Sequence, residues 1–142
     1  MERNPVIRPD GKLIQAVAHH GHLFVCGQGC CCGRTDRGFA PVYTELYHSE
    51  WERRKLRNKV HLTHTACLGP CALANVALLI FHGHTIWFHS LNTRPLIEEV
   101  YNYIETMLRA DRFLTPPASL AEYIFTGFVT ENTVDKENAL SL

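Results

Sequence analysis

The alternation of apolar and polar positions predicts four strands and two main helices. Four short segments carry the apolar runs or the alternation that are typical of strands: 22–26, 59–65, 76–81 and 85–89. Apolar residues at helical spacing predict one helix over 39–56. A second helix is expected after Asn92 or Thr93, either of which suits its N-cap, with Pro95 in its first turn. The order along the chain is therefore strand, helix, strand, strand, strand, helix.

This order predicts an α/β fold with a mixed four-stranded sheet. The first two strands enclose a helix and are expected to be parallel, whereas a turn at 82–85 joins the last two as an antiparallel hairpin. We divide the chain into a lead-in at 1–21, a domain at 22–110 and a C-terminal extension at 111–142. The lead-in reads as irregular, with a short strand or helical turn around 13–18. The extension is expected to hold a short helix around 120–125 and a frayed end.

Composition and charge exclude several classes of protein. The formal net charge is zero, which gives no electrostatic reason to expect nucleic acid as a partner. No apolar run approaches the length that spans a bilayer, so no membrane partner is expected. The first residues lack the apolar core of a signal peptide. We therefore expect a cytoplasmic protein.

Six cysteines lie in two tight groups. They are Cys26, Cys30, Cys31, Cys32, Cys67 and Cys71. In a reducing compartment such groups indicate metal binding or redox chemistry rather than structural disulfides. One group follows the first predicted strand and the other follows the second. Loops that leave parallel strands at the same edge of a sheet lie close together, so the two groups are expected to meet.

Thiolate ligands select soft metal centres such as zinc, Cu(I) or iron–sulfur clusters, and four thiolates are the usual complement of a 2Fe-2S cluster. Cys67 and Cys71 are spaced to hold one corner of such a site, with the Gly69-Pro70 turn between them. A structural zinc site commonly uses two pairs with two intervening residues, and no pair in this chain has that spacing. This spacing weakens the zinc alternative without removing it.

The pattern Cys26, four residues, Cys31, thirty-five residues, then Cys67-Leu-Gly-Pro-Cys71 resembles the thioredoxin-like 2Fe-2S ferredoxins, particularly the thioredoxin-like subunit of respiratory NADH dehydrogenases. The resemblance covers about 22–110. It implies a trimmed thioredoxin-like fold, a homodimer, a one-electron role at low potential, and one cluster on Cys26, Cys31, Cys67 and Cys71. Only one of the three adjacent cysteines is needed; the spacing favours Cys31, and Cys32 comes next.

A narrower resemblance covers Val25 to Arg34, Val-Cys-Gly-Gln-Gly-Cys-Cys-Cys-Gly-Arg, which is similar to the CbiW-type ferredoxins of cobalamin biosynthesis. It implies a role in cobalt reduction or insertion, with a corrin-pathway reductase or chelatase as the redox partner protein. Arg34 and Arg37 are placed to steer an acidic partner. Trp87 is our candidate for a dimer contact, because aromatic residues are enriched at interfaces.

Two alternatives stay open, and neither the motifs nor their spacing gives a catalytic set, so we expect no enzyme. One alternative is a zinc- or cobalt-binding metallochaperone module that uses cysteine and histidine. Nine histidines occur, and His82 and His84 share a strand face, which makes a chelating pair plausible. The other is a thioredoxin-type thiol redox enzyme, disfavoured because no Cys-x-x-Cys precedes the first helix.

Overall fold

The computed structural model describes residues 2–27 and 31–129, and for Cys71 its description ends at the backbone. The main elements are β1 (Glu2–Ile7), β2 (Leu13–Ala18), β3 (Gly21–Cys26), α1 (Thr44–Arg53), β4 (Val60–Thr65), β5 (Ala77–Phe81), β6 (His84–Phe88), α2 (Arg94–Ala110), α3 (Ala118–Ala121) and β7 (Ile124–Phe125). Two short 3-10 turns, η1 (Thr35–Arg37) and η2 (Cys71–Leu73), lie in the loops.

The main sheet has the strand order β4-β3-β5-β6-β7. β3 and β4 run parallel, and the remaining neighbours are antiparallel. The predicted mixed α/β fold is therefore confirmed, with the four predicted strands in one sheet and the two main helices in place. The short β7 was not predicted and adds a fifth strand at one edge.

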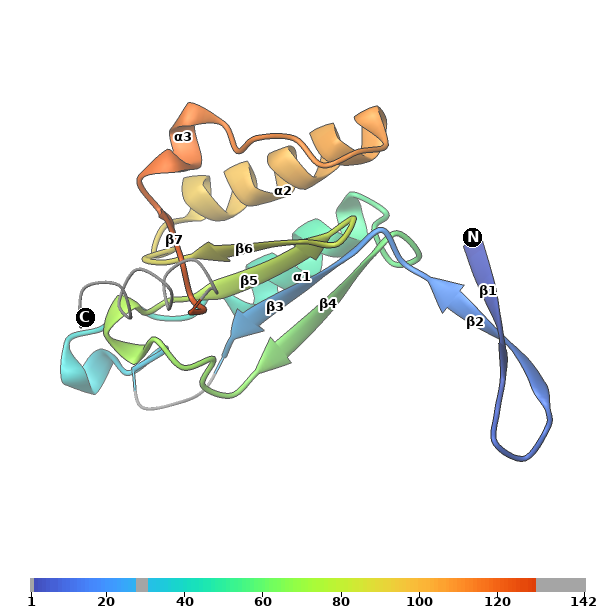
Figure 1. Cartoon of the computed structure of the whole chain (residues 1–142). Coiled ribbons are helices and arrows are strands. Elements are labelled where there is room, and N and C mark those ends of the chain that lie inside the picture. The colour runs from blue at the N-terminus through green and yellow to red at the C-terminus, as the bar shows by residue number, and fades with distance from the viewer. Residues whose placement is uncertain (1, 28–30, 130–142) are drawn as a thin grey trace, which may run out of the picture.

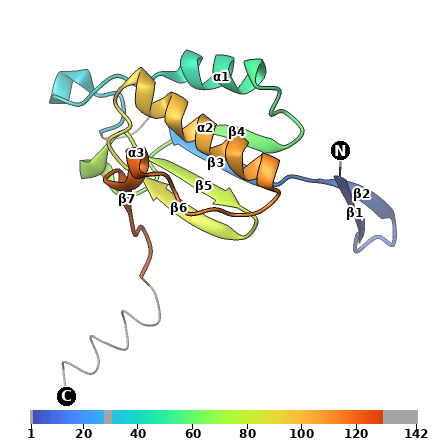
Figure 2. The ribbon, with the colours of Figure 1, turned by 90° about the horizontal axis from the view of Figure 1, so that it is seen from above.

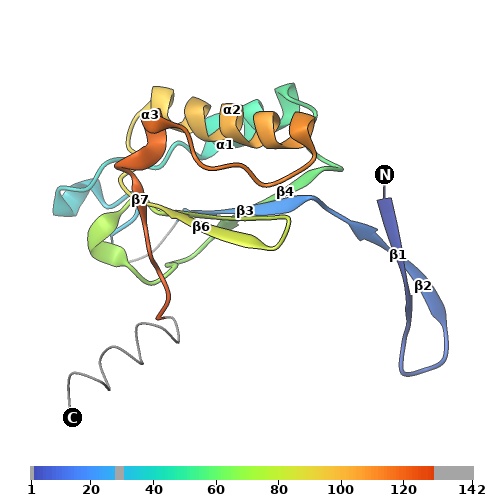
Figure 3. The same cartoon turned by 45° about the horizontal axis from the view of Figure 1, so that its top comes forward.

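Both main helices pack on one face of the sheet, as Figure 3 shows. Alternate residues of each strand point to that face, so Leu23 and Val25 of β3 are almost fully buried between sheet and helices. Two buried hydrogen bonds tie α1 to its neighbours, one to α2 and one to the sheet. The Tyr101 hydroxyl of α2 donates to the Tyr47 carbonyl at 2.7 Å, and the Trp51 indole donates to the Val60 carbonyl at 2.7 Å.

The helix boundaries follow local chemistry. Thr93 caps α2, its hydroxyl accepting from the Leu96 N–H at 3.4 Å, which resolves the choice between Asn92 and Thr93. α1 is shorter than the predicted 39–56: it begins at Thr44, because the preceding segment is held as a loop by side-chain contacts described below.

The N-terminal region is a hairpin rather than an irregular lead-in. β1 and β2 pair antiparallel, which confirms the strand at 13–18 and corrects the rest of that prediction. Figures 1 and 2 show the hairpin extending away from the body at one end of the sheet. Apolar side chains on it are exposed: Val6, Ile7, Leu13, Ile14 and Val17. Since the hairpin lacks a core of its own, its apolar residues have no shelter within the described chain.

The C-terminal extension packs α3 against α2 on the helix face, adds β7 at the β6 edge of the sheet, and then covers Trp87 on the open face. A short helix, α3, forms slightly earlier than predicted, and β7 follows it. Trp87 is only 5% exposed, because Phe125 and Phe128 pack on its ring and Gly127 lies so close that an added Cβ would meet the indole. The expectation that Trp87 contacts a second chain is therefore corrected: the chain's own extension covers it. The last dozen residues, predicted to fray, lie outside the described residues.

Within the part of the chain that the structure describes, no helix has the length and apolar character needed to cross a membrane.

Candidate metal centre at the cysteine end of the sheet

The sheet topology brings the two cysteine loops to one place. Cys26 ends β3 opposite Thr65 at the end of the parallel strand β4, and the Gly27 N–H donates to the Thr65 carbonyl at 2.9 Å. On the other side of β3, the Cys26 N–H donates to the Val76 carbonyl at 3.1 Å, just before β5. The loop 66–76 therefore leaves the sheet on one side of Cys26 and returns on the other, crossing the end of β3.

Cys26 and Cys32 form a disulfide, with their Cα atoms 6.1 Å apart. Both are nearly buried, at 1% and 5% exposed. Leu68, which belongs to the second cysteine loop, packs against the small apolar cluster that these two cysteines form with Ala74. The expectation that the two loops meet in space is thus met by direct contact.

Cys31, which the spacing favours as a ligand, lies at the side of this cluster. It is half-buried, takes no part in a disulfide and packs against the cluster that Cys26 and Cys32 form. The side chain that reaches the Cys26 sulfur is that of Cys32, the second choice from the sequence. Cys30 lies outside the described residues.

Cys67 stands at the solvent side of the same end. It is exposed, and its sulfur accepts a hydrogen bond from the Gly69 N–H at 3.3 Å. Gly69 has φ of +119°, a conformation that only glycine adopts readily. In this conformation the Gly69 N–H points back at the Cys67 sulfur. An N–H donor favours the charged thiolate form of a cysteine and tunes metal centres bound to it. Cys71 follows at the start of η2.

Asn75 fixes the loops relative to one another, and the sequence reasoning missed it. Its side-chain oxygen accepts from the Gly33 N–H at 3.2 Å, directly after the cysteine triplet. Its amide nitrogen donates to the carbonyls of Ala40 and Pro41 at 3.3 and 3.0 Å. The residue is 4% exposed, so this clamp is shielded from water. An asparagine directly before an apolar strand was the available signal, since a polar side chain there needs buried partners.

The surface around Arg34 and Arg37 has a smaller net positive charge than these two arginines alone would give. The Arg34 guanidinium donates to both carboxylate oxygens of Asp36 at 2.9 and 2.8 Å. This hydrogen bonding holds the pKa of Asp36 below its ordinary value, so the carboxylate stays charged. With Arg37 counted, the three side chains carry a net charge of plus one.

Several of the nine histidines gather at the opposite end of the sheet. The predicted pair of His82 and His84 does not form, because His84 stacks on Phe113 while His82 faces His20. His22 lies nearby on the open sheet face, where desolvation and the neighbouring His61 and His19 lower its pKa. Its ring shares a 2.7 Å hydrogen bond with the Thr63 hydroxyl. The histidine end is therefore separate from the cysteine end.

Comparison with known proteins gives limited similarity. No family model matches the chain, and no curated protein matches it. Among solved structures, two of the thioredoxin-like [2Fe-2S] ferredoxin from Aquifex aeolicus are similar to it. One is 20% identical, with a TM-score of 0.47, over 77% of this chain and 99% of the other. The second is 20% identical, with a TM-score of 0.48, over 80% and 98%. With identities of 20% and TM-scores below 0.5, these similarities carry no conclusion about a cofactor. Any inference about a cofactor therefore rests on the cysteines of this chain.

Proposed function

We propose that this protein is an electron carrier that binds one 2Fe-2S cluster per chain at the cysteine end of the sheet, and that it is not an enzyme. One observation carries the proposal: the loop with Cys67 and Cys71 crosses the strand end that carries Cys26, and Cys32 is in contact with that same residue. Cysteines from two loops thus converge on one place, and a 2Fe-2S cluster requires four such ligands.

The donor set and its surroundings fit such a group. The buried sulfurs of Cys26 and Cys32 supply a dry side, and the exposed Cys67 with its Gly69 N–H supplies a hydrogen-bonded side toward solvent. When bound, the cluster would supply one-electron exchange through that exposed side. Cys26 and Cys32 would bind iron as thiols that lose their protons, so the cluster would have to be inserted while both are reduced, before the buried disulfide closes.

The disulfide itself favours a second candidate function, thiol–disulfide exchange. Exchange requires a thiolate to reach one of the two bonded sulfurs. Both Cys26 and Cys32 are at most 5% exposed, so an incoming thiolate has little access to either. The burial therefore favours the cluster over exchange.

Anaerobic purification with analysis of iron and acid-labile sulfide, followed by EPR after one-electron reduction, tests the proposal. We expect about two irons and two sulfides per chain and a paramagnetic signal in the reduced state. Zinc or cobalt without sulfide would contradict it and support the metallochaperone alternative. Fast reduction and reoxidation of the disulfide by thioredoxin-like partners, without iron, would support thiol exchange.

The choice among the adjacent cysteines has its own test. If Cys31 is the ligand, as the spacing favours, Cys31→Ser loses iron and Cys32→Ser keeps it. If the contact between Cys32 and Cys26 marks the ligand, the opposite result is expected. Cys30→Ser serves as the control and should retain iron in both cases.

The proposal also covers the oligomeric state of the protein and its cellular compartment. We propose a homodimer, supported by the exposed apolar residues of the hairpin and by Ile80, 38% exposed on the open sheet face. Light scattering on the full chain tests this, with Ile80→Lys as the variant expected to disrupt the dimer.

We also propose a reducing, cytoplasmic setting, since the ligand thiols must stay reduced. A link to cobalt reduction or insertion in cobalamin biosynthesis, with a corrin-pathway reductase or chelatase as partner, rests on the resemblance at Val25–Arg34.

A further inference from the structure

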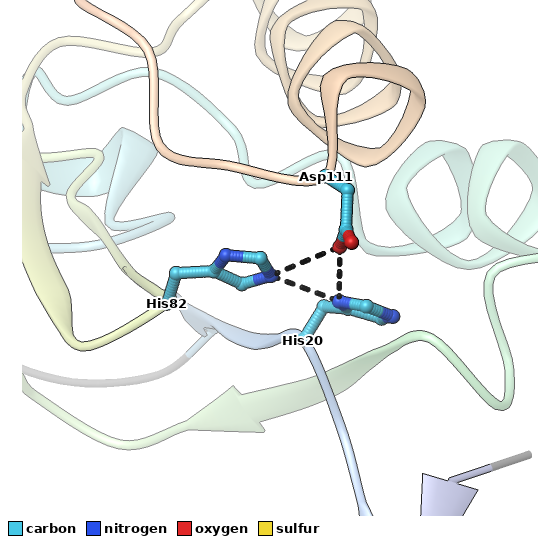
Figure 4. Close-up of side chains that lie close together, drawn as sticks. All are labelled: His20, His82 and Asp111. Carbon is cyan, nitrogen blue, oxygen red and sulfur yellow. Dashed lines mark hydrogen bonds and ion pairs between the residues drawn. The ribbon is translucent and has the colours of Figure 1, made fainter.

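Three side chains from distant parts of the chain converge at the end of the sheet opposite the cysteines. His20 lies in the link between β2 and β3, His82 in the β5–β6 turn and Asp111 directly after α2. Figure 4 shows their polar atoms directed toward a common point. β3 separates this end from Cys26 by six residues, which is about 20 Å at 3.3 Å per residue.

The distances between the three atoms suit a metal ion. His20 Nδ1 lies 2.9 Å from His82 Nε2 and 3.7 Å from an Asp111 carboxylate oxygen, and His82 Nε2 lies 3.8 Å from that oxygen. In a triangle with these sides, the point equidistant from the atoms is about 2 Å from each, and zinc is held by nitrogen and oxygen at about 2.0–2.2 Å.

A fourth side chain, that of Glu2, lies beside the ring of His20. A carboxylate oxygen of Glu2, in β1, lies 3.9 Å from His20 Nε2, the nitrogen that does not face the cluster. A carboxylate at this position favours a proton on Nε2 and leaves the Nδ1 lone pair directed at His82 and Asp111. At 3.9 Å this is an electrostatic contact, at the place where metal-binding histidines commonly hydrogen-bond a carboxylate that fixes their tautomer.

The surroundings leave room for further ligands. The three residues border a cavity of about 740 Å³ that His19, His22 and His61 also line. Asp111 is exposed, whereas His20 and His82 have side chains only 24% and 29% exposed. Water therefore has access to complete the coordination on the Asp111 side.

We propose that His20, His82 and Asp111 form a binding site for a divalent transition-metal ion of the zinc class, with the Glu2 carboxylate beside the outer nitrogen of His20. Two imidazoles and one carboxylate with open positions are a donor set that zinc and Fe(II) use, whereas Mg²⁺ and Ca²⁺ prefer oxygen ligands alone. The site bridges the start of the hairpin, the main sheet and α2. Bound metal therefore stabilises the folded chain.

Substitutions that keep the backbone are available at two of the ligands. His82 and Asp111 have φ of +45° and +52°, and asparagine adopts this left-handed conformation readily. His82→Asn and Asp111→Asn thus remove a ligand without straining the chain. His84→Asn, in the same hairpin but stacked on Phe113, is the matched control.

Titration of the full-length reduced protein with Co²⁺, followed by visible absorption, tests the proposal. Sulfur ligands add a strong charge-transfer band that nitrogen and oxygen ligands lack, so the two ends of the sheet are read separately. We expect one saturable site without sulfur character, displaced by Zn²⁺ and not by excess Mg²⁺. Loss of a side chain that hydrogen-bonds a metal ligand costs about 10–100-fold in affinity. We therefore expect at most about 10-fold for Glu2→Gln and at least about 100-fold for His82→Asn and Asp111→Asn.

Two control variants separate cobalt binding at the histidine end from binding by the cysteines or a general loss of structure. His84→Asn and Cys67→Ser should bind Co²⁺ at this site as the wild type does, and zinc should raise the melting temperature of the wild type more than that of Asp111→Asn. Wild-type affinity in His82→Asn, or a cobalt spectrum that depends only on Cys67, would overturn the proposal. Neither result bears on the iron and sulfide content, so this proposal and the cluster fail independently.

Discussion

The two ends of β3 present opposite kinds of ligand in opposite surroundings. At the Cys26 end, sulfur atoms lie against a small apolar cluster, and a buried amide clamps the loops that carry them. At the His20 end, imidazole and carboxylate groups border an open cavity. Soft ligands in a dry site suit a tightly held cluster, whereas borderline ligands in an open site suit a metal ion that exchanges with solvent. One sheet thus holds apart two candidate metal sites with different chemistry.

Removal of a cysteine ligand is the largest expected effect on this contrast. Cys26→Ser and Cys67→Ser should each lose most of the iron and sulfide, because a hydroxyl replaces a thiolate. The measurement is iron and sulfide per chain after anaerobic purification. Binding of Co²⁺ at the histidine end should be unchanged. Parallel loss of both would show that the two ends are one site or one folding unit.

Removal of a ligand at the histidine end has the next largest expected effect. His20→Ala should reduce cobalt affinity at the histidine end by at least about 100-fold while the iron and sulfide content stays as in the wild type. A decrease in sulfide content in this variant would mean that the histidine end supports the cluster.

Asn75→Ala is expected to act on the cysteine end through its loops. Three backbone groups in partly buried hydrogen bonds, on Gly33, Ala40 and Pro41, lose their partner, which should cost about 2–3 kcal/mol of unfolding free energy. Chemical denaturation measures this, and the exposed Asn58 gives the control Asn58→Ala. The rate of iron release to a chelator should rise as well. Unchanged stability with Asn75→Ala would mean that the clamp is replaced by water.

The smallest expected effect is a pH dependence next to the cysteine end. Desolvation, and then the charge of His48, lower the pKa of His64, which lies edge-on to Tyr47. The unfolded chain therefore binds more protons than the folded one near pH 6.5, and stability falls as the pH drops through that value. His64→Gln should show a smaller loss between pH 7.5 and 5.5 in denaturant titrations. An equal loss would assign the slope to other histidines.

Periodic segments were predicted well, and contacts between distant segments were not. The apolar runs predicted β3, β5 and β6 within a residue, because a short apolar run bounded by turn residues is typical of a buried strand. The meeting of the two cysteine loops also followed from the parallel strands alone. The contact of Cys32 rather than Cys31 with Cys26 depends on how a loop turns, which spacing does not specify.

The same limit explains the histidine end. His82 was singled out from the sequence, but His20 and Asp111 join it only because the β2–β3 link and the end of α2 lie beside the β5–β6 turn. Similarly, Trp87 looked like an interface residue until the extension at Phe125 and Phe128 was placed over it. Tertiary packing of the segment after α2 decides both points, and no local pattern encodes it.

A complete inventory of metal and sulfide tests the account most directly. The full-length protein is purified anaerobically, supplied with iron, sulfide and zinc together, desalted and analysed. The account predicts about two irons, two sulfides and one zinc per chain, with the zinc lost in Asp111→Asn and the iron and sulfide lost in Cys67→Ser. Zinc that depends on Cys67, with no sulfide retained, would contradict it.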